Sequence, residues 1–192
     1  MPLYIDKQES EIKVKGSAFI ASACPIESRE EAEQFLATIQ KKYFDATHHC
    51  YAYQTGFGQG LSFRYNDDGE PSGTAGKPIY HVITGRHLTN LIIVVTRYFG
   101  GTKLGTGGLS RAYADSAIDV LTRCETVTRI IYRTIHVQFP YYETSTVMRL
   151  IGLFEAKINE TKYEALTEMA IAIRANETDR FCLQLIDLTR GK

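Results

Sequence analysis

The sequence is poor in several features that would assign it to a specialised class of protein. It has no tryptophan, and its four cysteines are scattered without any Cys-x-x-Cys pair. Such cysteines exclude a disulfide scaffold and are typical of reduced thiols, so we expect a cytoplasmic protein. No apolar run approaches the roughly 18 residues of a membrane span, and residues 1–10 lack the basic and apolar regions of a secretory signal. We therefore expect no membrane partner.

Net charge is absent as well, because 22 Lys and Arg balance 22 Asp and Glu. A neutral chain does not surround a polyanion as a histone does, so any contact with phosphate must come from a local site. Hydrophobic residues make up 44% of the 192 residues, with 12 Tyr and 9 Phe. This composition excludes a disordered chain and suits one large domain or two small ones.

Hydrophobic periodicity divides the front of the chain into alternating strands and helices. The capping-box pattern from Ser28 to Glu31 predicts the start of a helix. Pro78 suits the first residue of another helix. The apolar run Leu91–Thr96 predicts a central strand. The expected elements are strands at 12–15 and 18–25, a helix at 32–43, paired strands at 50–54 and 61–65, a helix at 78–85, a strand at 91–96, and a glycine loop at 100–108 that opens a helix to 123.

The hydrophobic periodicity changes after a polar run at residues 124–129. This change predicts two domains, 1–125 and 130–192. The back part predicts a strand at 130–139, a helix at 143–153 and strands at 157–163 and 169–175. Residues 179–188 carry too many apolar side chains to decide between helix and strand. One strand, a helix, two strands and one further element are typical of a ferredoxin-like sandwich, so the expected fold class is α+β.

The glycine loop is the best candidate for a binding site. Residues 98–111 contain five glycines between the apolar strand and the next helix. Glycine lets the backbone approach a ligand, and the start of a helix offers unpaired amides to an anion. A tight connection that needs glycine for packing alone is the alternative. The third glycine of a dinucleotide fingerprint would fall on Ser110, which excludes that motif. The expected anion-binding residues in this region are Lys103, Gly105, Gly107, Gly108, Ser110 and Arg111.

A second loop, residues 67–78, also ends at a predicted helix. It is not a phosphate-binding P-loop, because Pro71 and Pro78 stand where that motif requires glycine and Ser or Thr. Lys77 remains beside the helix start as an expected phosphate contact. Asp67, Asp68 and Glu70 suit either a Mg²⁺ ion or a solvated turn. We favour the turn and expect neither a metal nor a cofactor.

The run His48-His49-Cys50 lies on a predicted strand, where His48 and Cys50 face one side and His49 the other. At most two of them share a face, and a zinc site needs three or four ligands. We therefore expect a packed strand with His48 lining a polar groove. Aromatic residues near these segments offer stacking surfaces, although aromatics at strand alternation are more often core. They are Tyr51, Tyr53, Phe63, Tyr65, Tyr98 and Phe99.

Three segments, Asp45–Tyr53, Asp67–Pro78 and Arg97–Tyr113, together resemble the bacterial form of the IMPACT family over about residues 12–123. The resemblance implies a front domain with the fold of the C-terminal domain of ribosomal small-subunit protein five. It also implies a ferredoxin-like back domain similar to the last domain of elongation factor G. Eukaryotic relatives are regulators of translation, and no catalytic residue is carried over. The matched signature positions are Arg97, Tyr98, Gly100, Gly101 and Gly105.

Two functional hypotheses follow. The first is a non-enzymatic regulator or accessory factor of translation that binds RNA, the ribosome or a translation factor. Its site would be a groove floored by residues 48–53 and walled by the two loops, with Lys77, Arg97, Lys103 and Arg111 meeting phosphate. The alternative is an enzyme that acts on a small phosphorylated substrate with Mg²⁺ held by Asp67, Asp68 or Glu70. We favour the first, because the P-loop pair and an obvious nucleophile are missing. The oligomeric state is left open.

Overall fold

The computed structural model describes residues 3–128 and 130–190. Residues 1–2 and 191–192, at the ends of the two predicted domains, and Arg129, in the predicted boundary, lie outside the described residues. The chain divides into two units, Met1–Arg129 and Ile130–Lys192, and each is described by itself. No helix in the described ranges is long and apolar enough to cross a bilayer.

The front unit is built on a five-stranded antiparallel sheet with the strand order β2-β3-β6-β4-β5. Its central strand is β6 (Leu91–Tyr98), of which seven of eight residues are buried. This confirms the predicted central strand and the predicted pairing of the two strands that precede it in sequence. The remaining strands are β2 (Gln8–Val14), β3 (Ser17–Pro25), β4 (His48–Thr55) and β5 (Ser62–Asn66), and a short β1 (Leu3–Ile5) pairs separately with β7 (Thr126–Thr128).

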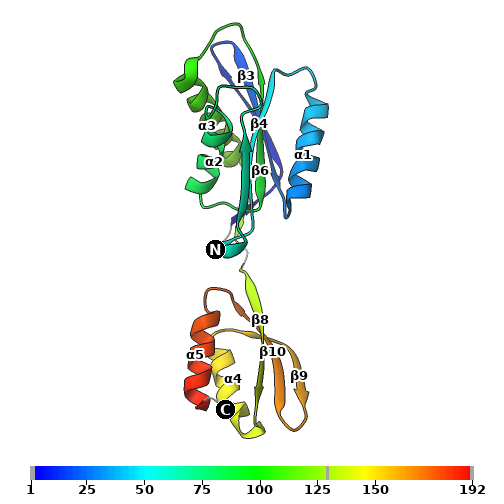
Figure 1. Ribbon diagram of the computed structural model, residues 1–192, viewed down its shortest axis with the longest axis vertical. Coiled ribbons are helices and arrows are strands. Elements are labelled where there is room, and N and C mark those ends of the chain that lie inside the picture. The colour runs from blue at the N-terminus through cyan, green and yellow to red at the C-terminus, as the bar shows by residue number, and fades with distance from the viewer. Residues whose placement is uncertain (1–2, 129, 191–192) are drawn as a thin grey trace. The chain divides into compact units, whose positions relative to one another are not determined.

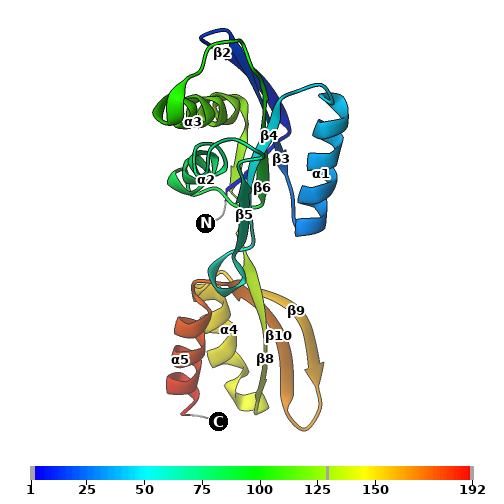
Figure 2. The ribbon, with the colours of Figure 1, turned by 45° about the horizontal axis from the view of Figure 1, so that its top comes forward.

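Helices cover both faces of this sheet (Figures 1 and 2). Helix α1 (Arg29–Lys42) packs on one face, and α2 (Gly76–Gly85) and α3 (Gly105–Arg123) pack on the other. Alternate residues of β6 therefore enter different cores: Ile93 and Val95 face α2 and α3, while Ile92 and Val94 face α1. Burying each such side chain stabilises the fold by about 1.5–3 kcal/mol. This two-sided burial explains why the strand reads as a continuous apolar run.

The helix starts differ from the sequence prediction in three details. Helix α2 begins at Gly76, two residues before the predicted first residue Pro78. At α1 the Glu31 amide donates to Ser28 Oγ at 3.2 Å, as a capping box requires, but the Glu31 carboxylate accepts from the amide of Glu27. Helix α3 begins at Gly105, so the predicted loop at 100–108 is too long. The glycines suggested a loop, whereas the buried Leu109 holds the residues before it in the first helical turn.

Three aromatic residues, two on strand β5 and one directly after β6, correct the expectation that aromatics in these segments are core. Phe63, Tyr65 and Phe99 are 50%, 40% and 47% exposed, whereas Tyr53 is buried. Phe63 and Tyr65 lie on β5, a strand at the edge of the sheet whose five residues are all exposed. The predicted strand is present, but because β5 lies at the edge of the sheet, no further strand beside it buries these side chains.

The back unit is a three-stranded antiparallel sheet with the order β8-β10-β9 and two helices on one face (Figure 1). Residues 179–188, left undecided by the sequence, lie within a helix, because Phe181 is buried edge-on against Phe154 at 5.3 Å between ring centroids. The strand order agrees with the predicted ferredoxin-like arrangement. The elements are β8 (Tyr132–Phe139), α4 (Thr144–Leu153), β9 (Lys157–Tyr163), β10 (Thr167–Arg174) and α5 (Thr178–Thr189).

Candidate functional site

A group of polar side chains is buried on the α2–α3 face of the front sheet, where β4 begins and β6 ends. The strand register brings it together, since Arg97 lies opposite Phe19 of β3 and opposite His48 of β4. The loop between β5 and α2 and one residue of α3 complete it. We call this group the polar cluster, and its members are Ser17, His48, Cys50, Glu70, Arg97 and Tyr113.

An ion pair between Arg97 and Glu70 forms the centre of the polar cluster. The Arg97 guanidinium donates to Glu70 Oε1 at 2.5 Å, and the Tyr113 hydroxyl donates to the same oxygen at 2.8 Å. The two charged side chains are only 6% and 4% exposed. The guanidinium carbon also lies 5.4 Å from the Phe19 ring centroid and 5.5 Å from that of Phe99. Arg97 is thus paired and enclosed, so it is not an exposed cation for phosphate as the sequence suggested.

His48 and Cys50 are held by the loop that carries Glu70. His48 Nδ1 lies 2.7 Å from the carbonyl oxygen of Asp68, and since a carbonyl only accepts, Nδ1 carries the proton. Cys50 Sγ lies 3.0 Å from the carbonyl oxygen of Asp67 and 3.3 Å from the Tyr113 hydroxyl. Burial raises the pKa of the Cys50 thiol well above its ordinary value. Cys50 is therefore a protonated, packed thiol and not a nucleophile.

The start of α2 is occupied by a carboxylate of the chain itself. Asp67 accepts hydrogen bonds from the amides of Gly73, Ala75 and Gly76 at 2.8, 2.9 and 2.8 Å. Amides at a helix start are the donors that an anion would use. Lys77 is exposed beside this start, where the amides of Ala75 and Gly76 already bind Asp67.

The acids considered for Mg²⁺ have other partners. The Asp68 carboxylate accepts from the amide of His49 at 2.6 Å, Asp67 caps α2, and Glu70 pairs with Arg97. Among residues 3–128 and 130–190, no three His, Cys, Asp or Glu side chains are placed to hold a metal ion together. In this fold the acidic loop forms a hydrogen-bonded turn.

Asp67 is expected to contribute more to stability than an ordinary helix cap. Asp67→Ala leaves three amides without their acceptor, so we expect the free energy of unfolding to fall by about 2 kcal/mol or more. Ser28→Ala, which removes the single cap bond of α1, should cost about 1 kcal/mol. Urea denaturation of both variants makes the comparison. Equal losses would show that the Asp67 bonds add nothing beyond one cap.

The start of α3 differs from those of α1 and α2 because no side chain caps it. Its N-cap residue is Leu104, and in the described part of the chain no side chain caps the helix and no backbone acceptor outside it is hydrogen-bonded to the amides of residues 105–107. Gly105, Thr106 and Gly107 are exposed, and Gly108 is half-buried. Unpaired amides at a helix start, together with the positive end of the helix dipole, favour an anion. Lys103 and Arg111 are exposed and Ser110 is half-buried on either side of this turn.

The polar cluster anchors the loop that leads to α3. Ser17 Oγ lies 3.4 Å from an Arg97 guanidinium nitrogen and accepts from the Gly100 amide at 3.1 Å. Gly100 packs directly on Gly16, at the tip of the β2–β3 hairpin: a Cβ on Gly100 would lie 2.0 Å from the Gly16 carbonyl carbon. The signature residues Arg97 and Gly100 therefore fix the path of the chain into α3. Gly101 and Gly105, also signature positions, have φ of +83° and +71°, which favour glycine.

Tyr98 points to the opposite face of the sheet from Arg97. Its hydroxyl donates to Asp45 Oδ1 at 2.7 Å, and this hydrogen bond raises the pKa of Tyr98 to about 12. The bond connects the end of β6 to the loop between α1 and β4. Tyr98 thus belongs to the framework of the front unit.

The predicted site residues therefore lie in three places. Lys103, Gly105, Gly107, Gly108, Ser110 and Arg111 surround the start of α3; His48 and Arg97 belong to the polar cluster; Lys77 lies at the capped start of α2. The sequence missed two members of the cluster, Ser17 and Tyr113, as functional neighbours of Arg97. Tyr113 stands within the third motif, which was its only signal, and Ser17 gave none.

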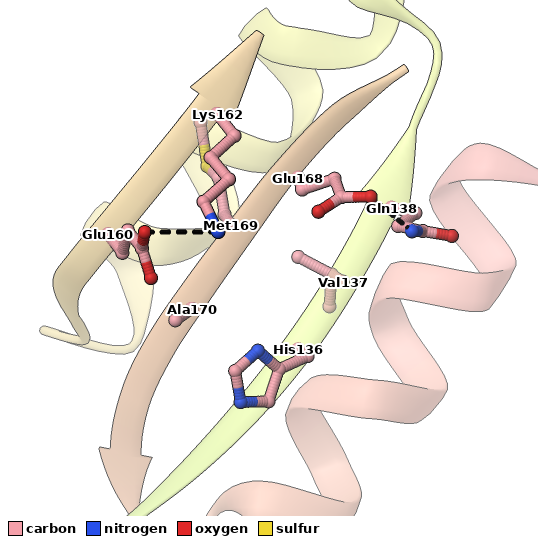
Figure 3. A pocket seen from close by; sticks show the side chains of 8 residues that line it. All are labelled: His136, Val137, Gln138, Glu160, Lys162, Glu168, Met169 and Ala170. Carbon is pink, nitrogen blue, oxygen red and sulfur yellow. Dashed lines mark hydrogen bonds and ion pairs between the residues drawn. The ribbon is translucent and has the colours of Figure 1, made fainter. Parts of the chain in front are cut away.

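A hollow of about 400 Å³ lies on the open sheet face of the back unit (Figure 3). Its charged side chains pair with neighbours: Lys162 with Glu160 at 3.3 Å, and Glu168 with Gln138 at 2.5 Å. His136 from β8 also lines it. Lys162 and Glu160 both lie on β9, while Glu168 and Gln138 lie on the adjacent strands β10 and β8. Because both carboxylates are paired, the hollow is a weaker candidate than the start of α3.

Comparisons with known proteins agree across both units. The family model described as the Impact N-terminal domain matches residues 15–121, and a domain of unknown function, DUF1949, matches residues 137–192. The Bacillus subtilis protein named IMPACT family member YvyE is 36% identical over 96% of this chain and 84% of its own length. IMPACT family member YigZ of Escherichia coli is 33% identical over 93% of this chain and 88% of its own length. A solved structure titled as a hypothetical protein is 31% identical, covers 100% of this chain and 95% of its own, and superposes with a TM-score of 0.65.

Proposed function

Because this chain belongs to the IMPACT family, we propose that it is a non-enzymatic regulator or accessory factor of translation that binds RNA phosphate at the start of α3. The role in translation rests on the family resemblance. The place of binding rests on the geometry of the front unit. We expect the RNA that it binds to be part of the ribosome.

The observation that carries this proposal is the contrast among the three helix starts of the front unit. Ser28 caps α1, and Asp67 accepts from the amides of Ala75 and Gly76 at the start of α2, while the amides of residues 105–107 in α3 have no side-chain cap within the described ranges. A carboxylate in the first turn is the usual internal solution for such donors. At α3 the chain supplies glycines instead, which leave room for an external anion.

The surrounding charges suit a small number of phosphate contacts. Lys103 and Arg111 are exposed near the turn, and the whole chain is neutral. Each neutralised phosphate on single-stranded nucleic acid contributes about −0.7 to the slope of log affinity against log salt. We therefore expect a shallow slope of about −1 to −3, in contrast to a chain with a broad basic surface.

A carboxylate introduced at residue 107 tests the site. Gly107→Asp should stabilise α3 through its dipole yet weaken the binding of a short fluorescein-labelled single-stranded RNA by about tenfold or more, because it occupies the amides and repels phosphate. Gly107→Asn is the matched control, since it has nearly the same shape without charge. Fluorescence anisotropy over a series of KCl concentrations measures both affinity and salt slope.

Gly107→Asp and Gly107→Asn with equal affinities would contradict the proposal. So would a steep salt slope, or equal losses from charge reversal of Lys103 and of distant lysines such as Lys41. Protection of the same turn by a protein partner instead of RNA would keep the site and change the ligand. A Mg²⁺-dependent enzyme has less support, because Asp67 and Glu70 already serve the α2 cap and Arg97.

A further inference from the structure

The outer edge of β5 is open to a further strand. In the sheet order β2-β3-β6-β4-β5, this strand pairs with β4 on one side, and no described strand pairs with its other side (Figure 2). All five of its residues are exposed. An edge strand presents a row of amides and carbonyls that another extended chain can bind.

The opposite edge of the same sheet is built differently. Strand β2 carries Glu9, Glu11 and Lys13 along seven residues, and charges of this kind discourage pairing at an edge. Strand β5 reads Ser-Phe-Arg-Tyr-Asn, with one charge, no proline and two large aromatic residues. Of the two sheet edges, β5 is therefore the one suited to accept a partner strand.

The side chains of β5 divide into two faces of different chemistry. Phe63 and Tyr65 face α2, where Phe63 stacks on Tyr80 at 4.6 Å between ring centroids and Tyr65 lies 5.8 Å from the same ring. Arg64 points to the other face, where its guanidinium is 4.0 Å from a carboxylate oxygen of Glu33 and both side chains are about half exposed. Glu33 also pairs with Arg29 at 2.7 Å, so the Arg64 and Arg29 guanidinium groups share this carboxylate.

We propose that the outer edge of β5 binds an extended segment of another protein as a sixth strand of the sheet, and that this segment alternates apolar and acidic residues. Main-chain hydrogen bonds to β5 would supply affinity. Cross-strand neighbours would supply specificity: apolar side chains against Phe63 and Tyr65, and an acidic side chain between them against Arg64. This surface goes beyond the phosphate site, involves none of its residues and does not depend on it.

The same features disfavour two other occupants. A second copy paired symmetrically about Arg64 would place two arginines directly opposite each other, which is destabilising. A single-stranded RNA would stack its bases on free aromatic faces, but Phe63 and Tyr80 stack on one another with planes 18° apart, which removes one face of each ring. What β5 offers instead is its backbone edge with aromatic side chains beside it.

Hydrogen exchange on the full chain tests the proposal. The probe is a short capped peptide in which valine and glutamate alternate, and the controls are the same peptide with lysine for glutamate and one with N-methylated alternate amides. On addition of the glutamate peptide at about 1 mM, within the range of weak peptide affinities, NMR should show slowed exchange of alternate amides in residues 62–66. Amides of β2 should not change.

Variants on the β5 edge and on the β2 edge test whether peptide binding depends on the side chains of β5. Arg64→Glu should weaken the glutamate peptide by about threefold to tenfold and strengthen the lysine peptide, as cross-strand charge pairs predict. Lys13→Glu, on the β2 edge, should change neither. Phe63→Ala, checked by thermal unfolding for an intact fold, should weaken both peptides.

Four outcomes would overturn the proposal. The first is unchanged exchange in β5 at every peptide concentration, and the second is binding that survives N-methylation. The third is protection of β5 by a uridine oligonucleotide in place of the peptides, which would make the surface an RNA site. The fourth is self-association in sedimentation that protects the same amides, which would make the occupant a second copy. Failure of RNA binding at Gly107 would leave these results untouched, so the two proposals fail separately.

Discussion

Replacing Arg97 with methionine is expected to lower the free energy of unfolding by about 3–5 kcal/mol. The substitution keeps an unbranched side chain between Phe19 and Phe99 but leaves the Glu70 carboxylate buried without its counter-charge. The Tyr113 hydroxyl and the His48 ring, whose Nε2 lies 3.9 Å from Glu70 Oε1, are then the polar groups beside that charge. A buried charge without a partner is among the most costly defects in a folded protein.

Urea denaturation measures this loss, and a double variant separates charge from packing. Arg97→Met with Glu70→Met removes both charges, so it should recover most of the stability lost by Arg97→Met alone. Arg29→Met provides a surface control, because its ion pair with Glu33 is exposed and should contribute less than about 1 kcal/mol. A loss at Arg97 no larger than at Arg29 would contradict the role of the pair as a buried anchor.

Gly100→Ala is expected to destabilise the front unit by about 3 kcal/mol or more. A Cβ there would lie 2.0 Å from the carbonyl carbon of Gly16 and 2.3 Å from the amide nitrogen of Ser17. Both neighbours are backbone atoms of the β2–β3 hairpin, which moves only if its strand pairing shifts. The same variant should also weaken RNA binding, because Gly100 fixes the path of the chain into α3.

Gly107→Ala is the matched control in the same segment. A Cβ at this position meets no atom within 4 Å among the described residues, and its φ lies outside the left-handed region. Because alanine favours a helix over glycine, the free energy of unfolding should rise by about 0.5–1 kcal/mol. Thermal unfolding of the two variants gives the comparison. Similar effects of both substitutions would contradict the packing of Gly100 on the hairpin.

Periodicity was enough to predict the elements that bury one or two complete faces. Strand β6 is apolar from Leu91 to Val95 because helices cover both sides, and α1 follows its cap Ser28 with buried residues at helical spacing. Periodicity failed where contacts between residues distant in sequence determine the secondary structure or the burial. Residues 179–188 became a helix through the contact of Phe181 with Phe154, and Phe63 and Tyr65 are exposed because β5 ends the sheet.

The candidate site shows the same division. Glycine content indicated the region where α3 begins, although not its first residue, and three motifs together indicated the family. Neither the glycine content nor the motifs showed which helix start keeps unpaired amides. That depends on Asp67, which accepts hydrogen bonds from the amides at the start of α2, whereas no side chain caps α3. Nor did they show that Arg97 is paired with Glu70, a residue 27 positions earlier in the chain.

By itself, then, the sequence determined what depends on neighbours along the chain: the alternation of strands, the spacing of helices, the position of the glycines and the zero net charge. Only the tertiary structure decided which charges are paired and which amides and strand edges remain open. Those properties depend on atoms that folding brings together from distant positions, and burial then strengthens each such contact by removing the water that would compete for it.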